Sequence, residues 1–379
     1  MALGAAVTVV ALMPVFLTSA MAVQMTRDLA FGSAGLGLAV AAFRSGGALT
    51  SVFLGRLTDQ LGAIRTIRLA AAVATLTTLG IATTARGLLS LVLWLAVGGS
   101  ALALAQPGAN RLLMNVVGAR RLGTAFGLKQ SAPPIASMLS GAAVPLIAIT
   151  VGWRWGFALA AIAAVGLMLG TTSPPPKPPG PDRRKGTPRL PIENRGMVIL
   201  LAIAFGLGTS TSSSVTTFYV VSASAAGSTS AFAGTMFAVA SVASIASRVL
   251  SGVLSDRLMR GHLTLCAVQL AIGAVGITML ATGTQTLMSA GVFIALIGCW
   301  GFNGVFWFAL VRAYSTIPGR ITGVVSPGGL MGSTLGPLIF GVLVDRIGFG
   351  PSWLTMSIVA LIAAGVMLVG DRQLTSQRS

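Results

Sequence analysis

Two basic side chains fall deep inside apolar stretches of the sequence, where a charge is costly and usually functional. Arg44 lies eleven residues before Gly55, roughly 16 Å from the end of its predicted helix. Lys129 lies roughly 10 Å inside another predicted helix. The acidic residues can all be placed outside such stretches: Asp28, Asp59, Asp182, Glu193, Asp256, Asp345 and Asp371. Charge within the helices is therefore expected to be basic, which predicts that a molecule bound there is an anion.

Other polar side chains recur at helical spacing. Gln106 and Asn110 are four residues apart and share a helix face near a Pro-Gly pair. Trp300, Asn303 and Trp307 form a second stripe, which offers flat surfaces and an amide. A tryptophan stripe also suits packing or a membrane interface, so the two readings of this stripe stay open.

A run of hydroxyl side chains over 209–217 ends close to Tyr219. Hydroxyls can bond to backbone carbonyls inside a helix, so about half of them are expected to need no bound molecule. The candidate substrate-binding residues are Arg44, Lys129, Gln106, Asn110, Tyr219, Trp300, Asn303 and Trp307.

Composition places most of the chain in lipid. Hydrophobic residues make up 54% and charged residues 8%, whereas soluble domains carry about 25% charged residues. The net charge of +18 sits in short loops, so we expect anionic lipids of the inner leaflet, and no nucleic acid, as its partner. The one histidine, His262, is expected in a loop, and no catalytic triad, phosphate loop or metal spacing occurs. We therefore expect no enzyme, no cofactor and no metal site.

Twelve segments have the length and hydropathy of membrane-spanning helices. They are expected at 4–24, 33–54, 66–84, 88–112, 122–149, 153–172, 196–221, 229–254, 263–282, 286–313, 321–345 and 350–370. The fold class is therefore an all-α membrane protein with twelve transmembrane helices. Residues 173–195 are rich in proline and basic side chains, which is typical of an extended, charged linker.

The distribution of arginine and lysine predicts the orientation. If both termini are cytoplasmic, that side receives the linker and ten further arginines, whereas the outer loops receive only Arg27, Arg86, Arg154 and Arg346. The positive-inside rule then predicts a multi-pass protein of a bacterial-type inner, or plasma, membrane with both termini inside.

The two halves of the chain repeat a short motif. The pattern Gly-x-Leu-x-Asp runs from Gly55 to Asp59 and returns from Gly252 to Asp256, an offset of 197 residues. Such an offset predicts a parallel repeat of six helices plus six. We expect an N-terminal bundle over 1–172, a cytoplasmic linker over 173–195 and a C-terminal bundle over 196–379.

At this point the chain resembles the major facilitator superfamily of secondary transporters. The resemblance rests on the six-plus-six arrangement and on the loop signature from Gly55 through Asp59 and Gly62 to Arg65. It implies two bundles, related by a pseudo-two-fold axis, that rock about a central site in alternating access. Helices one, four, seven and ten would line the cavity, and two, five, eight and eleven would form the bundle interface. The expected conformational gate comprises Gly55, Asp59, Gly62, Arg65, Gly252 and Asp256.

These observations together predict a secondary active or facilitative transporter of a small organic, carboxylate-like anion. If Lys129 stays charged, the protein would work as an exchanger or facilitator; if it titrates near neutral pH, anion and proton would move together. The alternatives are a multidrug or xenobiotic exporter of neutral or lipophilic compounds and a receptor without transport activity. The small-molecule substrate and the lipids are the expected partners, and we expect a monomer.

Overall fold

The computed structural model describes residues 2–116, 130–171, 195–258, 261–314 and 318–376, and these residues form helices and short turns. Apolar runs without charge satisfy their backbone polar groups inside a helix, which is the reason that helices dominate such a chain. The helices are α1 (Ala2–Ala20), α2 (Ala22–Leu29), α3 (Ser33–Thr84), α4 (Leu88–Val116), α6 (Ala132–Ala143) with the π-helical turn η2 (Val144–Ala148), α7 (Trp153–Gly170), α8 (Arg195–Ala225), α9 (Ser230–Arg257), α10 (His262–Leu280), α11 (Gln285–Ala313), α12 (Pro318–Ile347) and α13 (Phe349–Ser376).

The predicted spans correspond to these helices. Within the described part of the chain, 10 helices are long and apolar enough to cross a membrane, or up to 11 when α2 and the first part of α3 count as one bent span. The remaining predicted span, 122–149, is represented by the shorter apolar helix Ala132–Ala148, because its first residues lie outside the described ranges. The all-helical, membrane-spanning fold class is therefore confirmed.

The second and third predicted spans differ from expectation at their junction. We expected a loop between 54 and 66, but α3 remains helical through most of it and breaks only at Gly62, which has φ +75° and ψ 172°. That φ lies in the region that glycine alone enters without a steric penalty. One residue is thus enough to turn the chain.

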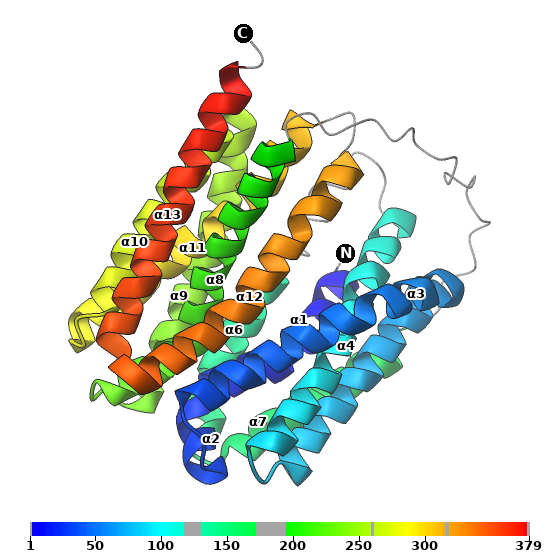
Figure 1. Cartoon of the computed structure of the whole chain (residues 1–379). Helices are drawn as coiled ribbons and strands as arrows, with labels where there is room; N and C mark the ends of the chain where they lie inside the picture. The colour runs from blue at the N-terminus through cyan, green and yellow to red at the C-terminus, as the bar shows by residue number, and fades with distance from the viewer. Residues whose placement is uncertain (1, 117–129, 172–194, 259–260, 315–317, 377–379) are drawn as a thin grey trace.

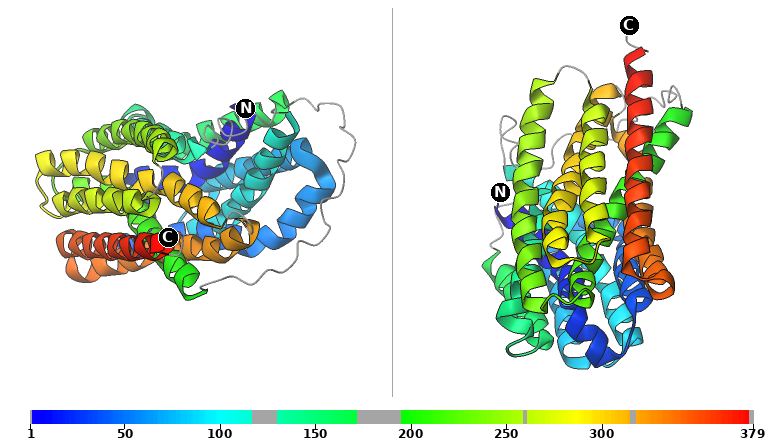
Figure 2. Two further views of the ribbon diagram at one scale, coloured as in Figure 1. Left: turned by 90° about the horizontal axis from the view of Figure 1, so that it is seen from above. Right: turned by 90° about the vertical axis from the view of Figure 1, so that its left-hand side faces the viewer.

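The two ends of the molecule differ in how closely its halves approach. We call one end of the molecule the terminal end; the helix ends that lie there are those near Gly62, Gly170, Arg195 and Arg257. We call the opposite end the distal end; the helix ends that lie there are those near Ala20, Ser33 and Ile347. The N-terminal half (α1–α7) and the C-terminal half (α8–α13) lie beside each other, as the view from above shows (Figure 2). Figure 1 shows α3 and α12 side by side at the distal end and diverging toward the terminal end.

Small residues let the halves meet at the distal end. A Cβ at Gly37 of α3 would lie 2.3 Å from the carbonyl oxygen of Pro337 of α12, and one at Gly141 of α6 would lie 2.8 Å from that of Gly234 of α9. Backbones that approach this closely need glycine at the contact. The expected interface of helices two, five, eight and eleven corresponds to these contacts.

Candidate functional site

Arg44 faces the interface between the halves. It lies seven residues, about two helical turns, beyond Gly37, so both residues share the face of α3 that approaches α12. Its side chain is half-buried, with the guanidinium carbon 6.0 Å from the centre of the Phe43 ring. Its Nε is buried and has no hydrogen-bond partner. The expectation that Arg44 points to the protein interior is thus met.

A second arginine inside the helices, Arg248 of α9, is absent from the sequence-based candidates. It donates a hydrogen bond of 2.6 Å to the carbonyl oxygen of Gln130 in the N-terminal half. Its guanidinium carbon lies 4.8 Å from the centre of the Trp300 ring, a cation–π contact, and its Nε is buried without a partner. The expectation that Arg44 and Lys129 are the two deep charges was therefore wrong.

Trp300 links this arginine to the other half of the molecule. The ring of Phe16, on α1, meets the Trp300 ring edge-on with 6.2 Å between the centres. The indole is 7% exposed, and its Nε1 is buried without a hydrogen-bond partner. Trp300 is thus, with Arg44, a sequence-predicted candidate whose position fits a site between the halves.

The buried side-chain atoms without hydrogen-bond partners include amide oxygens, hydroxyls and N–H donors. Among the described residues, three side-chain N–H donors lack an acceptor, and they belong to Arg44, Arg248 and Trp300. A buried donor without a partner costs about 1–3 kcal/mol, and more when it is charged. A bound molecule with acceptor atoms would satisfy such donors, and a positive charge at Arg44 or at Arg248 would favour an anion.

The hydroxyl run of α8 mainly holds helices together. Ser212 donates 2.7 Å to the carbonyl oxygen of Cys299 on α11, and Ser213 donates 3.1 Å to that of Ser333 on α12. Ser214 Oγ is buried and has no partner. Most of the run is therefore structural, which exceeds the half that was expected.

Two of the aromatic candidates pack into the protein. Tyr219 is 1% exposed and stacks on Phe237 with 6.2 Å between ring centres, near the closed distal end. Trp307 packs against Phe205, with 5.0 Å between ring centres, in the core of the C-terminal half. Neither of these side chains joins the Arg248–Trp300 pair, so packing explains both positions in this conformation.

The remaining amide candidates stay predictions. Gln106 and Asn110 are half-buried on α4, and each already has an interaction within the protein. Their neighbour Arg111 donates 2.8 Å to the carbonyl oxygen of Thr58, which ties α4 to α3. Asn303 is half-buried, one turn from Trp300 on α11. Lys129 lies outside the described residues.

The residues of the predicted gate lie at the terminal end, toward which α3 and α12 diverge (Figure 1). A Cβ at Gly55 or at Gly252 would meet nothing within 4 Å, so the close packing expected at Gly55 is not present in this conformation. Arg65 and Asp256 are exposed. The side chain of Asp59 lies outside the described set, so its pairing with Arg65 remains a prediction.

His262 differs from its predicted place in a loop. It is the first residue of α10, is 7% exposed and has its Nε2 at 3.2 Å from the carbonyl oxygen of Ser255. Its ring also lies against Phe308, with 5.2 Å between ring centres. These contacts give it a packing role at the start of the helix.

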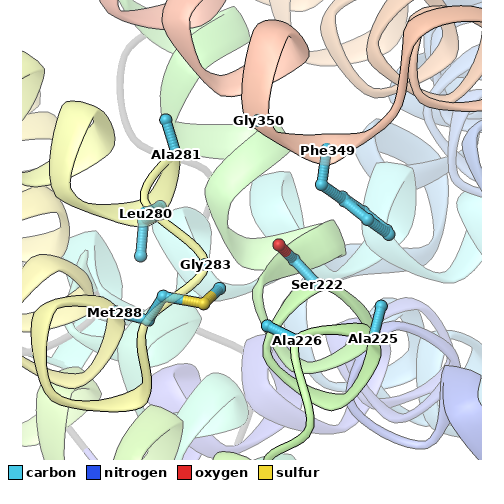
Figure 3. A pocket seen from close by; sticks show the side chains of 9 residues that line it. All are labelled: Ser222, Ala225, Ala226, Leu280, Ala281, Gly283, Met288, Phe349 and Gly350. Atoms are coloured by element: carbon cyan, nitrogen blue, oxygen red, sulfur yellow. The ribbon is translucent and has the colours of Figure 1, made fainter.

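A cavity of about 150 Å³ lies in the C-terminal half at the distal end (Figure 3). Its one hydroxyl group, on Ser222, accepts a hydrogen bond of 2.9 Å from Trp353 Nε1. An anion would find no charged side chain in this lining, which consists of Ser222, Ala225, Ala226, Leu280, Ala281, Gly283, Met288, Phe349 and Gly350.

The sequence is similar to known transporters over most of its length. Residues 4–328 match the Major Facilitator Superfamily. A protein of Mycobacterium tuberculosis described as a probable nitrate/nitrite transporter, NarK2, is 27% identical over 370 residues, which cover 93% of this chain and 91% of that protein. The same protein from a second strain matches equally well.

Solved structures share the fold. A bacterial homologue of the human lysosomal transporter Spinster, in an inward-facing and occupied conformation, has a TM-score of 0.77 at 15% identity and covers 98% of this chain and 96% of its own. The D-xylose–proton symporter has a TM-score of 0.73 at 15% identity, covering 96% of each chain. The arrangement of the helices and the family match agree, and this chain belongs to the major facilitator superfamily of membrane transporters.

Proposed function

We propose that this transporter carries a small planar oxyanion and binds it with Arg44, Arg248 and Trp300 between the two halves. The observation that carries the proposal is the set of three buried N–H donors without acceptors, two of which are charged. A guanidinium presents paired donors in one plane, which match the paired oxygens of a planar anion.

Two kinds of anion share this chemistry. A small carboxylate is the substrate class that the basic residues within the helices predict. The nitrate or nitrite named for the relative from M. tuberculosis is also small, planar and monovalent. Both kinds of anion present oxygens with delocalised charge, so the same arginine N–H donors could bind either kind, and we treat them as one substrate class.

The positions of the described carboxylates favour exchange or facilitated transport over proton coupling. Asp28, Asp256 and Asp345 are exposed and Asp371 is half-buried, and all four lie at helix ends. None of these groups is placed to carry a proton through the middle of the membrane. If the protein changes between its inward-open and outward-open states more easily once an anion neutralises the arginines, it would act as an antiporter or a facilitator.

The orientation belongs to the same proposal. With both termini cytoplasmic, as the loop arginines favour, the terminal end faces the cytoplasm and the described conformation is open inward. The two bundles would be joined by the linker over 173–195. The Gly55–Arg65 signature and its partner around Asp256 would then close the cytoplasmic side in the opposite state.

A thermal-shift screen of the purified protein tests the substrate class. A ligand that binds only the folded state must raise the melting temperature. We expect stabilisation by nitrate, nitrite or a small carboxylate, and a reduced shift in Arg44→Gln and Arg248→Gln. Stabilisation by neutral lipophilic compounds alone, unchanged in both variants, would instead support an exporter of such compounds.

A further inference from the structure

Asp345, at the end of α12, makes an unusual contact across the two halves. Its Oδ1 accepts a hydrogen bond of 3.1 Å from the backbone N–H of Ser33, and its Oδ2 accepts one of 2.9 Å from that of Ala34. Ser33 and Ala34 are the first two residues of α3, in the N-terminal half. One carboxylate thus bonds with both oxygens to the start of a helix in the other half.

The helix has no capping side chain of its own. The first N–H groups of any α-helix lack an acceptor within that helix. In α3 the residue at the N-cap is Gly32, which has no side chain to supply an acceptor. Asp345 therefore takes the role that serine, threonine or aspartate usually plays at this position, and its charge also suits the positive end of the helix dipole.

The fit depends on close contact between α3 and α12. A Cβ at Gly32 would lie 3.3 Å from Asp345 Oδ2, and a Cβ at Gly341 of α12 would lie 2.3 Å from the carbonyl oxygen of Ser33. Any movement that separates the distal ends of these helices must break both hydrogen bonds. It would also return two N–H groups of α3 to solvent.

We propose that Asp345 is the latch of the distal gate, a positioning residue that stabilises the distal-closed state by capping α3 across the interface. The latch acts only in that state, because its two hydrogen bonds join one half to the other. It sets how much of the protein is distal-closed, and it acts without touching the substrate.

The chain supplies a matched control for this idea. Asp371 of α13 likewise accepts hydrogen bonds at the start of α10, with one backbone N–H instead of two: its Oδ1 accepts 3.1 Å from the N–H of Leu263 and its Oδ2 accepts 2.9 Å from Thr264 Oγ1. Both helices of this second cap belong to the C-terminal half. Its loss should therefore lower stability and leave the balance between the two conformations unchanged.

The test measures distances across the distal end in the full chain. Spin labels at Arg86 and Thr286, both exposed and in different halves, report whether that end is open or closed. They are read in the parent protein, in Asp345→Ala and Asp345→Asn, and in Asp371→Ala. Asparagine keeps one acceptor oxygen and the shape of aspartate, so this variant is a second route if alanine impairs folding.

We expect Asp345→Ala to raise the ratio of distal-open to distal-closed protein about tenfold, the size of one helix cap. Asp345→Asn should give a smaller rise, and Asp371→Ala none. The proposal is overturned if neither Asp345 variant changes the distance distribution. It is equally overturned if Asp371→Ala changes the distribution as much as Asp345→Ala does.

Discussion

Replacing Arg248 by glutamine removes the positive charge at the junction of the two halves. In the present conformation the arginine donates to Gln130 at 2.6 Å and covers the Trp300 ring at 4.8 Å. Its Nε adds no hydrogen bond to the protein. We therefore expect this donor to be available to a bound anion.

The expected loss of anion affinity depends on the hydrogen bond that Arg248 would make to the anion, and its contacts within the protein do not contribute to it. A hydrogen bond to a charged group contributes about 1.5–3 kcal/mol, which corresponds to roughly a 10- to 100-fold loss of anion affinity. The bond to Gln130 and the ring contact affect the protein with and without substrate, so they change stability rather than affinity. Lysine at this position keeps the charge but lacks the planar fork, and we expect it to restore only part of the affinity.

The assay is uptake of the anion into proteoliposomes, with KM and kcat determined separately. Arg257→Gln is the matched control, because Arg257 is exposed at the end of the same helix and carries the same charge. We expect KM to rise for Arg248→Gln alone. An unchanged KM for Arg248→Gln, or an equal rise for Arg257→Gln, would refute the role of Arg248 in binding.

Three further changes test other parts of the account. Gly37→Val should open the distal end, because its Cβ would lie 2.3 Å from Pro337 O and overpacking costs about 1–3 kcal/mol. Gly365→Val is the control and should not open that end, because a Cβ there would meet nothing within 4 Å. Equal spin-label distances across the distal end in the two variants would contradict this prediction. Asp59→Asn should leave folding intact and shift the protein toward the terminal-open state, as distances across that end would reveal. A cysteine at Gly180 in a Cys-free background should resist an impermeant reagent added outside intact cells, and labelling there would reverse the orientation.

The helices could be predicted from the sequence because hydropathy alone specifies them. Long apolar segments gave the spans, and spacing placed Arg44 on an inward face. The predicted loop between 54 and 66 was too long, because a charged, polar stretch resembles a loop even where the helix continues through it. The backbone break there depends on one positive φ, which hydropathy does not report.

The site could be predicted only in part, because its residues depend on contacts between distant segments. Arg248 lies six residues before the end of the predicted window of 229–254. From that position its long side chain could extend to the membrane–water interface, so the sequence alone does not mark it as buried. Its contacts join α9 to Gln130, just before α6, and to Trp300 of α11, which only the fold brings together. The position of Asp345 against Ser33 has the same origin.

Uptake of labelled anions by the reconstituted protein tests the central claim most directly. Nitrate, nitrite, small carboxylates and a neutral lipophilic compound would be compared in proteoliposomes with the wild type and with Arg44→Gln. The account predicts saturable uptake of at least one planar oxyanion by the wild type, with strongly reduced uptake by the variant. Transport of the neutral compound alone, at the same rate in both proteins, would contradict it.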